Sequence, residues 1–147
     1  MDGDCVQTVD RFLKTPCYII DFLPKQVPKD CGGQFFEVED YLLNNDGRYG
    51  FRDRFIRIIL KMMCYYPVSV YWSEWMEQPT PEFVVKIMDT IKENHSSDVN
   101  ILFTSKDAFL KFEWDCLNIC IYNPDEEMCV LFEQIASSEG MFWRKAG

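Results

Sequence analysis

The sequence has little of what enzymes commonly use. It holds one histidine, His95, among 147 residues, in the polar segment Lys-Glu-Asn-His-Ser-Ser-Asp that follows an expected helix. Serine or cysteine nucleophiles usually need an imidazole base, so only His95 can serve as one. Its position at a helix C-terminus favours a structural role. Since Gly-x-Ser-x-Gly, P-loop and Gly-x-Gly-x-x-Gly patterns are also missing, we predict no catalytic residues.

Long apolar runs are missing as well. No apolar segment approaches the roughly 20 residues that cross a bilayer. The N-terminus, Met-Asp-Gly-Asp-Cys, is acidic, whereas a secretory signal has a basic start and an apolar stretch. We therefore expect a cytoplasmic protein that does not bind a membrane.

Paired metal ligands are also lacking. The seven cysteines are Cys5, Cys17, Cys31, Cys64, Cys116, Cys120 and Cys129. Their scattered spacing contains no Cys-x2-Cys pair, and zinc sites use closely spaced ligands. Two acidic clusters, 37–40 and 125–127, contain carboxylates of the kind that bind metal ions, but the second is typical of a helix start. We predict reduced thiols, no metal and no cofactor.

Charge is unevenly distributed. The net charge is −9, of which −1 belongs to residues 1–66 and −8 to residues 67–147. An acidic surface repels nucleic acid and favours either a basic protein partner or simply solubility. One basic stripe, Arg54, Arg57 and Lys61, lies along an expected helix. Three interpretations stay open: a solvated helix face, a site for phosphates or an acidic partner, and pairing with the protein's own acidic half.

Composition and pattern predict one α+β domain over residues 1–147. Apolar residues make up 48% and aromatic residues 16% of the chain, enough for one packed core. Helices do not alternate regularly with strands, which favours a mainly antiparallel sheet of about five strands with helices packed mostly on one face. The expected strands are 17–23, 68–72, 99–104, 108–114 and 117–122, with a possible short strand at 141–144. The expected helices are 4–14, 34–43, 49–64, a helix that begins at Pro81, and a helix that ends near Ser137.

Three of these helices have specific signals. In 49–64, apolar residues recur with the helical period, from Phe51 to Met62. Thr80 is a suitable N-cap for the helix at Pro81, and Asn123 with Pro124 suggests the same arrangement for the last helix. In 34–43, Phe35, Val38 and Leu42 share one face, which we expect to pack on the core.

The segment 71–79 is the strongest candidate for a contact site. We expect a loop here, because the segment lies between a strand and a capped helix. Large apolar groups beside acids on a loop are typical of a docking site for a basic protein. In the alternative interpretation, the indole of Trp75 folds back on the core. The candidate contact residues are Trp72, Glu74, Trp75, Met76 and Glu77.

Three further stretches carry a resemblance. The run from Ile19 to Pro28, the run from Gly33 to Glu39 and the closing Glu-Gly-Met-Phe at 139–142 resemble small uncharacterised proteins of gut Gram-positive bacteria. That resemblance implies no activity and no site residue. In size and charge the chain is also similar to bacterial immunity proteins, a class that neutralises toxins by binding them.

Three functions follow as hypotheses. The first is a non-enzymatic acidic module that binds a basic protein, as an immunity-like or regulatory inhibitor. The second is an enzyme or small-ligand protein with a carboxylate-lined pocket, for which the candidates are Asp21, Glu37 and Glu113. The third is a structural subunit that self-associates through surface aromatics. The sequence leaves the oligomeric state and the partner's identity open.

Overall fold

A single twisted sheet with helices on both faces forms the protein. The computed structural model describes residues 2–28, 30, 33–72, 74–94, 98–113 and 117–146. Within these residues the sheet has seven strands in the order β3-β2-β4-β5-β6-β1-β7, and every neighbouring pair is antiparallel. The strands are β1 (Cys17–Asp21), β2 (Val68–Trp72), β3 (Glu74–Glu77), β4 (Asp98–Phe103), β5 (Ala108–Glu113), β6 (Asn118–Tyr122) and β7 (Phe142–Lys145). The helices are α1 (Asp2–Leu13), α2 (Gln34–Asn44), α3 (Asp46–Tyr49), α4 (Phe51–Met63), α5 (Pro81–Asn94) and α6 (Glu126–Ser138).

The α+β class and the antiparallel sheet are confirmed, but the expected number of about five strands is wrong. The sheet is wider because β3 adds an unexpected edge strand and β7 forms at the other edge, where a short strand was expected at 141–144. β3 pairs with β2 in a tight hairpin, with Tyr71 opposite Trp75, and β7 pairs with β1. The expected loop at 71–79 is therefore a hairpin whose second strand is an edge strand.

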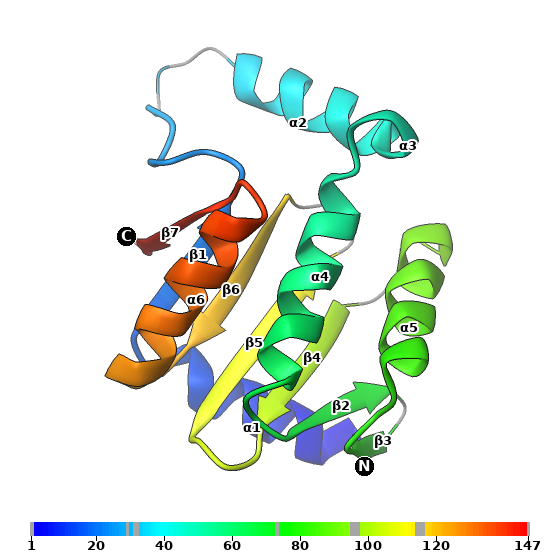
Figure 1. The fold of residues 1–147 in the computed structure, drawn as a ribbon, viewed down its shortest axis with the longest axis vertical. Helices are drawn as coiled ribbons and strands as arrows, with labels where there is room; N and C mark the ends of the chain where they lie inside the picture. The colour runs from blue at the N-terminus through cyan, green and yellow to red at the C-terminus, as the bar shows by residue number, and fades with distance from the viewer. Residues whose placement is uncertain are drawn as a thin grey trace.

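Different sets of helices cover the two faces of the sheet. Figure 1 shows α4, α5 and α6 across one face and α1 behind the other. Side chains alternate along each strand, so the residues that face the three long helices form the main core. The core's fully buried side chains from strands and helices include Ile20, Val70, Val99, Leu110, Ile119, Ile121, Phe55, Ile58, Met62, Val84, Ile91 and Phe132. On the other face, the Phe12 ring of α1 stacks on Phe109 with 5.4 Å between ring centroids.

Helix α4 follows the expected stripe but begins later. Gly50 has φ of 69°, a left-handed conformation that separates α3 from α4, so the helix begins at Phe51 rather than at residue 49. Phe55, Ile58 and Met62 are fully buried, as the periodicity predicts. Residues 46–49 form the short helix α3, which the sequence pattern does not predict.

The helix caps are partly as expected. Thr80 Oγ1 accepts a hydrogen bond from the backbone N–H of Phe83 at 3.2 Å, which confirms its capping role in α5. For α6 the N-cap is Asp125, whose carboxylate accepts from the N–H of Met128 at 2.9 Å, and the expectation for Asn123 is wrong. The side chain of Asn123 instead donates to the carbonyl of Asp107 at 2.7 Å.

Helix α2 packs more shallowly than its pattern predicts. It contains no buried residue, and Val38 of the expected core face is exposed. Its attachment to the body uses a ring contact between Phe35 and Phe22, with 6.3 Å between centroids. None of the helices in the described part of the chain is long and apolar enough to cross a bilayer.

A substitution of Phe132 tests the assignment of the hydrophobic core. Its ring is fully buried, stacks on Trp143 at 5.3 Å between centroids and meets Phe103 edge-on at 6.0 Å. Phe132→Ala is expected to lower the free energy of unfolding in urea by about 3–5 kcal/mol, because it leaves a cavity. Phe36→Ala, at a side chain that is 68% exposed, is the matched control and is expected to change it by less than about 0.5 kcal/mol. Equal effects of the two substitutions would contradict the assigned core.

Candidate functional site

Two of the three cations in the basic stripe of α4 form ion pairs with a carboxylate from the acidic half of the chain. Arg57 Nε donates to Glu139 Oε1 at 2.7 Å, and Lys61 Nζ lies 2.7 Å from Glu139 Oε2. Lys61 also donates to Ser138 Oγ at 3.0 Å. Arg54 places its guanidinium over the Phe51 ring, 5.0 Å from the centroid. Of the three interpretations, the pairing of the stripe with the protein's own acids is therefore observed for Arg57 and Lys61.

This pair of ion bridges fixes how α4 and α6 lie together. Arg57 and Lys61 belong to the second half of α4, and Glu139 directly follows the last residue of α6. Burial alone would raise the pKa of Glu139, but the hydrogen bonds and charges of Lys61 and Arg57 outweigh it and lower the pKa. The carboxylate therefore stays ionised and neutralises positive charge at this end of the helix pair.

At the other end of the helix pair lies a hollow that we call the tyrosine groove. It has a volume of about 470 Å³ and is lined by Tyr65, Tyr66, Glu127, Val130, Leu131 and Gln134. Tyr65 is 64% and Val130 55% exposed, so two large apolar groups face solvent beside each other. Apolar surface that gathers in a hollow is typical of an interaction site.

A hydrogen bond builds the polar wall of the groove. Tyr66 OH donates to Glu127 Oε1 at 2.8 Å and so joins the turn after α4 to the first turn of α6. Burial, the hydrogen bond to Glu127 and the charges of Glu127 and Asp125 raise the pKa of Tyr66 to about 12. The phenol therefore remains a neutral donor to the Glu127 side chain.

The charge around the tyrosine groove is negative. Helix α6 contains Glu126, Glu127 and Glu133, all exposed, and no lysine, arginine or histidine. One cation, Lys106, lies beside the groove, with its Nζ 5.7 Å from the centroid of the Tyr66 ring. It is paired with Asp125 at 2.8 Å, and the hydrogen bond to this carboxylate raises the pKa of Lys106. The groove thus combines apolar lining with excess negative charge.

The residues predicted as a contact site lie at the edge of the sheet. Trp75 is half-buried and meets Tyr71 edge-on, with 5.3 Å between ring centroids. Since Tyr71 and Val70 point to opposite faces, the indole packs on the second face and is not a lid on the main core. Met76 is 39% exposed and Glu77 is exposed. The side chains of Trp72 and Glu74 lie outside the described residues, although both positions belong to the hairpin strands.

The three candidate pocket carboxylates are not brought into one cavity. Asp21 is buried on β1, where Arg144 Nη2 donates to its Oδ2 at 3.0 Å. Glu113 lies on β5, with Lys111 Nζ 3.6 Å from its Oε1. Glu37 is exposed on α2 and accepts from Gln34 at 3.3 Å. None of the three lines the tyrosine groove or the hollow along α5.

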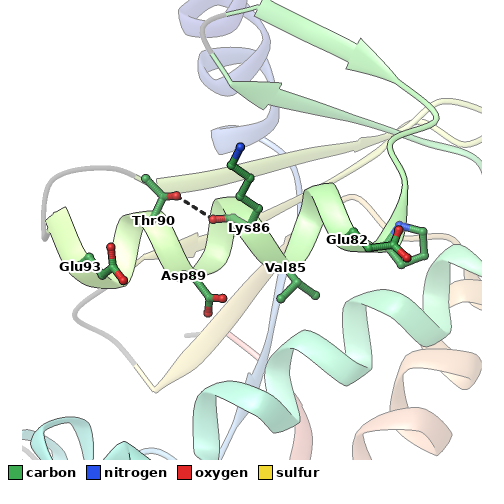
Figure 2. A pocket seen from close by; sticks show the side chains of 7 residues that line it. Glu82, Val85, Lys86, Asp89, Thr90 and Glu93 are labelled. Carbon is green, nitrogen blue, oxygen red and sulfur yellow. Dashed lines mark hydrogen bonds between the residues drawn. The ribbon is translucent and has the colours of Figure 1, made fainter.

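A second depression lies along the outer side of α5. It measures about 550 Å³ and is lined by Pro81, Glu82, Val85, Lys86, Asp89, Thr90 and Glu93. Figure 2 shows these side chains spread along a single helix, with the Thr90 hydroxyl donating to the Lys86 carbonyl at 2.7 Å. Because one helix alone supplies the lining, the groups do not converge on a common point as they do in ligand sites.

Sequence reasoning missed the tyrosine groove, although one signal was present. Along α6, the apolar residues Met128, Leu131, Phe132 and Ile135 recur with the helical period and predict its core face. Val130 lies out of phase with them, so the periodicity itself places an apolar residue on the wet side of the helix. Its neighbour Tyr65, 65 positions earlier in the sequence, could be found only from the structure.

Neither metal ligands in the described residues nor similarity to known proteins indicates a function for the chain. Within the described ranges, no three histidine, cysteine, aspartate or glutamate side chains gather closely enough to hold a metal ion. His95 lies outside the described residues. Comparison of the chain with family models, curated proteins and solved structures finds no match.

The ion bridges of Glu139 give a pH-dependent prediction. Glu139→Gln is expected to lower the free energy of unfolding at neutral pH by about 1 kcal/mol, because Arg57 and Lys61 are themselves about half exposed. The pKa of Glu139 is lowered in the folded state, so its stabilisation is present above the unfolded pKa, near 4.5, and is lost as pH falls through the folded pKa. Urea titrations of the two proteins should therefore converge in acid. Glu133→Gln, at an exposed position of the same helix, should show little difference at any pH, and a constant loss for Glu139→Gln down to acid pH would contradict the ion-bridge assignment.

Proposed function

We propose that this protein is a non-enzymatic acidic module that binds a basic protein partner in the tyrosine groove. The observation that carries the proposal is the coincidence, in one hollow, of exposed apolar side chains and an acidic helix without a single basic residue. A partner segment with an apolar side chain between lysines or arginines has the matching chemistry. Such a module acts as a regulatory inhibitor or in the manner of bacterial immunity proteins.

The contacts around the groove favour binding over catalysis. Glu127 is already oriented by Tyr66, and Lys106 is already paired with Asp125, so the wall is rigid before a partner arrives. Preorganised side chains lose less conformational entropy on association. The exposed rings and aliphatic groups supply apolar area, while the carboxylates speed encounter and fix orientation.

The location proposed for this function is the cytoplasm. Cys17, Cys64, Cys120 and Cys129 are free thiols, which fits a reducing compartment. The alternative of an enzyme or small-ligand protein finds less support, because Asp21, Glu37 and Glu113 line no common cavity. The edge-strand residues Trp75, Met76 and Glu77 remain a second candidate for the docking surface.

The test uses two matched substitutions in capture from a lysate of the source organism. Val130→Lys places a positive charge in the groove, and Val38→Lys makes the same change on α2, where Val38 is also exposed. Bound proteins are quantified by mass spectrometry at about 0.05 M and about 0.5 M salt, since screening weakens exposed charge pairs. We expect a basic protein held by wild type at low salt, lost about tenfold or more with Val130→Lys and retained with Val38→Lys.

Two further variants separate the candidate surfaces. Trp75→Ala removes the aromatic group of the edge strand and should leave capture unchanged if the groove is the docking site. Loss of the partner with Trp75→Ala or Val38→Lys, together with retention by Val130→Lys, would move the site away from the groove. Capture of no basic protein by wild type at low salt would overturn the proposed function itself.

A further inference from the structure

Two thiols lie together on the face of the sheet opposite the groove. β1 and β6 pair with Cys17 opposite Tyr122 and Ile19 opposite Cys120. Cys17 and Cys120 are therefore diagonal neighbours, and because side chains alternate along a strand they point to the same face. Tyr122, directly opposite Cys17, lies on this face too, and the Cys17 thiol donates a hydrogen bond to the backbone carbonyl of Tyr18 at 3.6 Å.

The environments of the two thiols differ. Cys17 is the first residue of β1, directly after Pro16, and it is half-buried. The hydrogen bond from Cys120 lowers the pKa of Cys17 to about 7, against burial, and Tyr122 lowers it further. In turn, the hydrogen bond with Cys17 and burial raise the pKa of Cys120. A pKa of about 7 leaves about half of the Cys17 side chains as thiolate at neutral pH, beside a protonated Cys120.

Few charged groups act on this pair. On β5, Lys111 lies directly opposite Cys120 and is paired with Asp98 and Glu113, and the carboxylate of Glu113 raises the pKa of Cys120. On β7, Arg144 lies opposite Ile19 and is bound to Asp21. On α1, Arg11 is bound to Asp107 at 2.9 Å. The thiolate of Cys17 is thus stabilised mainly by hydrogen bonds from Cys120 and Tyr122.

From this arrangement we infer that Cys17 and Cys120 form a hydroperoxide-oxidisable dithiol, with Cys17 as the attacking thiolate and Cys120 as the resolving thiol. Oxidation-sensitive cysteines are accessible thiolates that often lie next to a resolving cysteine. The other described thiols lie apart from this pair: Cys64 directly follows the last residue of α4, and Cys129 lies on α6, where burial raises its pKa.

The chemistry balances with hydrogen peroxide as the oxidant. The Cys17 thiolate attacks one peroxide oxygen, the O–O bond breaks, and hydroxide leaves, which gives a sulfenic acid on Cys17. The sulfur of Cys120 then attacks the Cys17 sulfur, loses its proton and displaces the hydroxyl group as water. The hydroxide takes up a proton from solvent, equivalent to the one that Cys17 released on ionising. In total, two thiols lose two electrons and two protons, and one peroxide becomes two molecules of water.

The disulfide would require a small shift of β1 along β6. Diagonal Cα atoms in an antiparallel pair are about 7–8 Å apart, whereas disulfides usually join Cα atoms within about 6.8 Å. Cys17 is the terminal residue of its strand, so the movement involves only the start of β1. A bond formed under such strain is more easily reduced, which suits a switch better than a permanent crosslink.

The experiment oxidises the whole protein with hydrogen peroxide and identifies the products by peptide mass spectrometry. Wild type is expected to give a Cys17–Cys120 crosslinked peptide, lighter by two hydrogens, that dithiothreitol reverses. Cys120→Ser is expected to stop at the sulfenic acid on Cys17, trapped as a dimedone adduct. Cys17→Ser is expected to lose both products. Circular dichroism of each variant checks that it folds.

Cys64 and Cys129 serve as internal controls in the same samples. The inference predicts that Cys17 reacts at least about tenfold faster than either, as its larger thiolate fraction at neutral pH requires. Equal or faster reaction at Cys64 or Cys129 would overturn it. A sulfenic acid on wild-type Cys17 that persists without crosslinking to Cys120 would overturn the resolving role.

Discussion

The ion bridges of Glu139 with Arg57 and Lys61 determine which charged side chains the helical layer exposes to solvent. They join α4 to the end of α6, 2.7 Å from nitrogen to oxygen in each case. By using the cations of the basic stripe internally, they leave the outer side of α6 with carboxylates alone. The same helix pairing brings Tyr65 and Tyr66, from the turn after α4, beside the first two turns of α6. The groove and its negative charge therefore both follow from one pairing of helices.

The two faces of the sheet are consequently specialised. The face under α4, α5 and α6 carries the main core and, at the rim of its helices, the proposed docking groove. The other face is covered in part by α1 and carries polar side chains together with the Cys17–Cys120 pair. Strand β1 lies between β6 and β7, and helix α6 packs on β7. A shift of the first residue of β1 would therefore act on β7 and, through it, on α6. The thiol pair and the groove are thus separate sites that share a structural neighbour.

Much of the fold follows from local signals in the sequence. The periodicity from Phe51 to Met62, the cap at Thr80 and the β-rich runs predicted most elements within two residues. The edge strand β3 was not predicted from the sequence, because its four residues have Glu at both ends. It forms by pairing with β2 rather than by its own strand propensity. The cap of α6 was assigned to Asn123 because Pro124 suits a first helical position, but Asp125 reaches the N–H of Met128. The groove was not predictable, since Tyr66 and Glu127 are 61 positions apart.

The central claim is that a basic partner contacts the tyrosine groove, and photocrosslinking tests it most directly. A photoreactive phenylalanine analogue is placed at Tyr65 in the groove or, as a matched control, at Tyr41, which is similarly exposed on α2. After irradiation in lysate at low salt, the account predicts a crosslinked basic protein from position 65 and none from position 41. A crosslink to a basic protein from position 41 alone, or none from position 65, would contradict it.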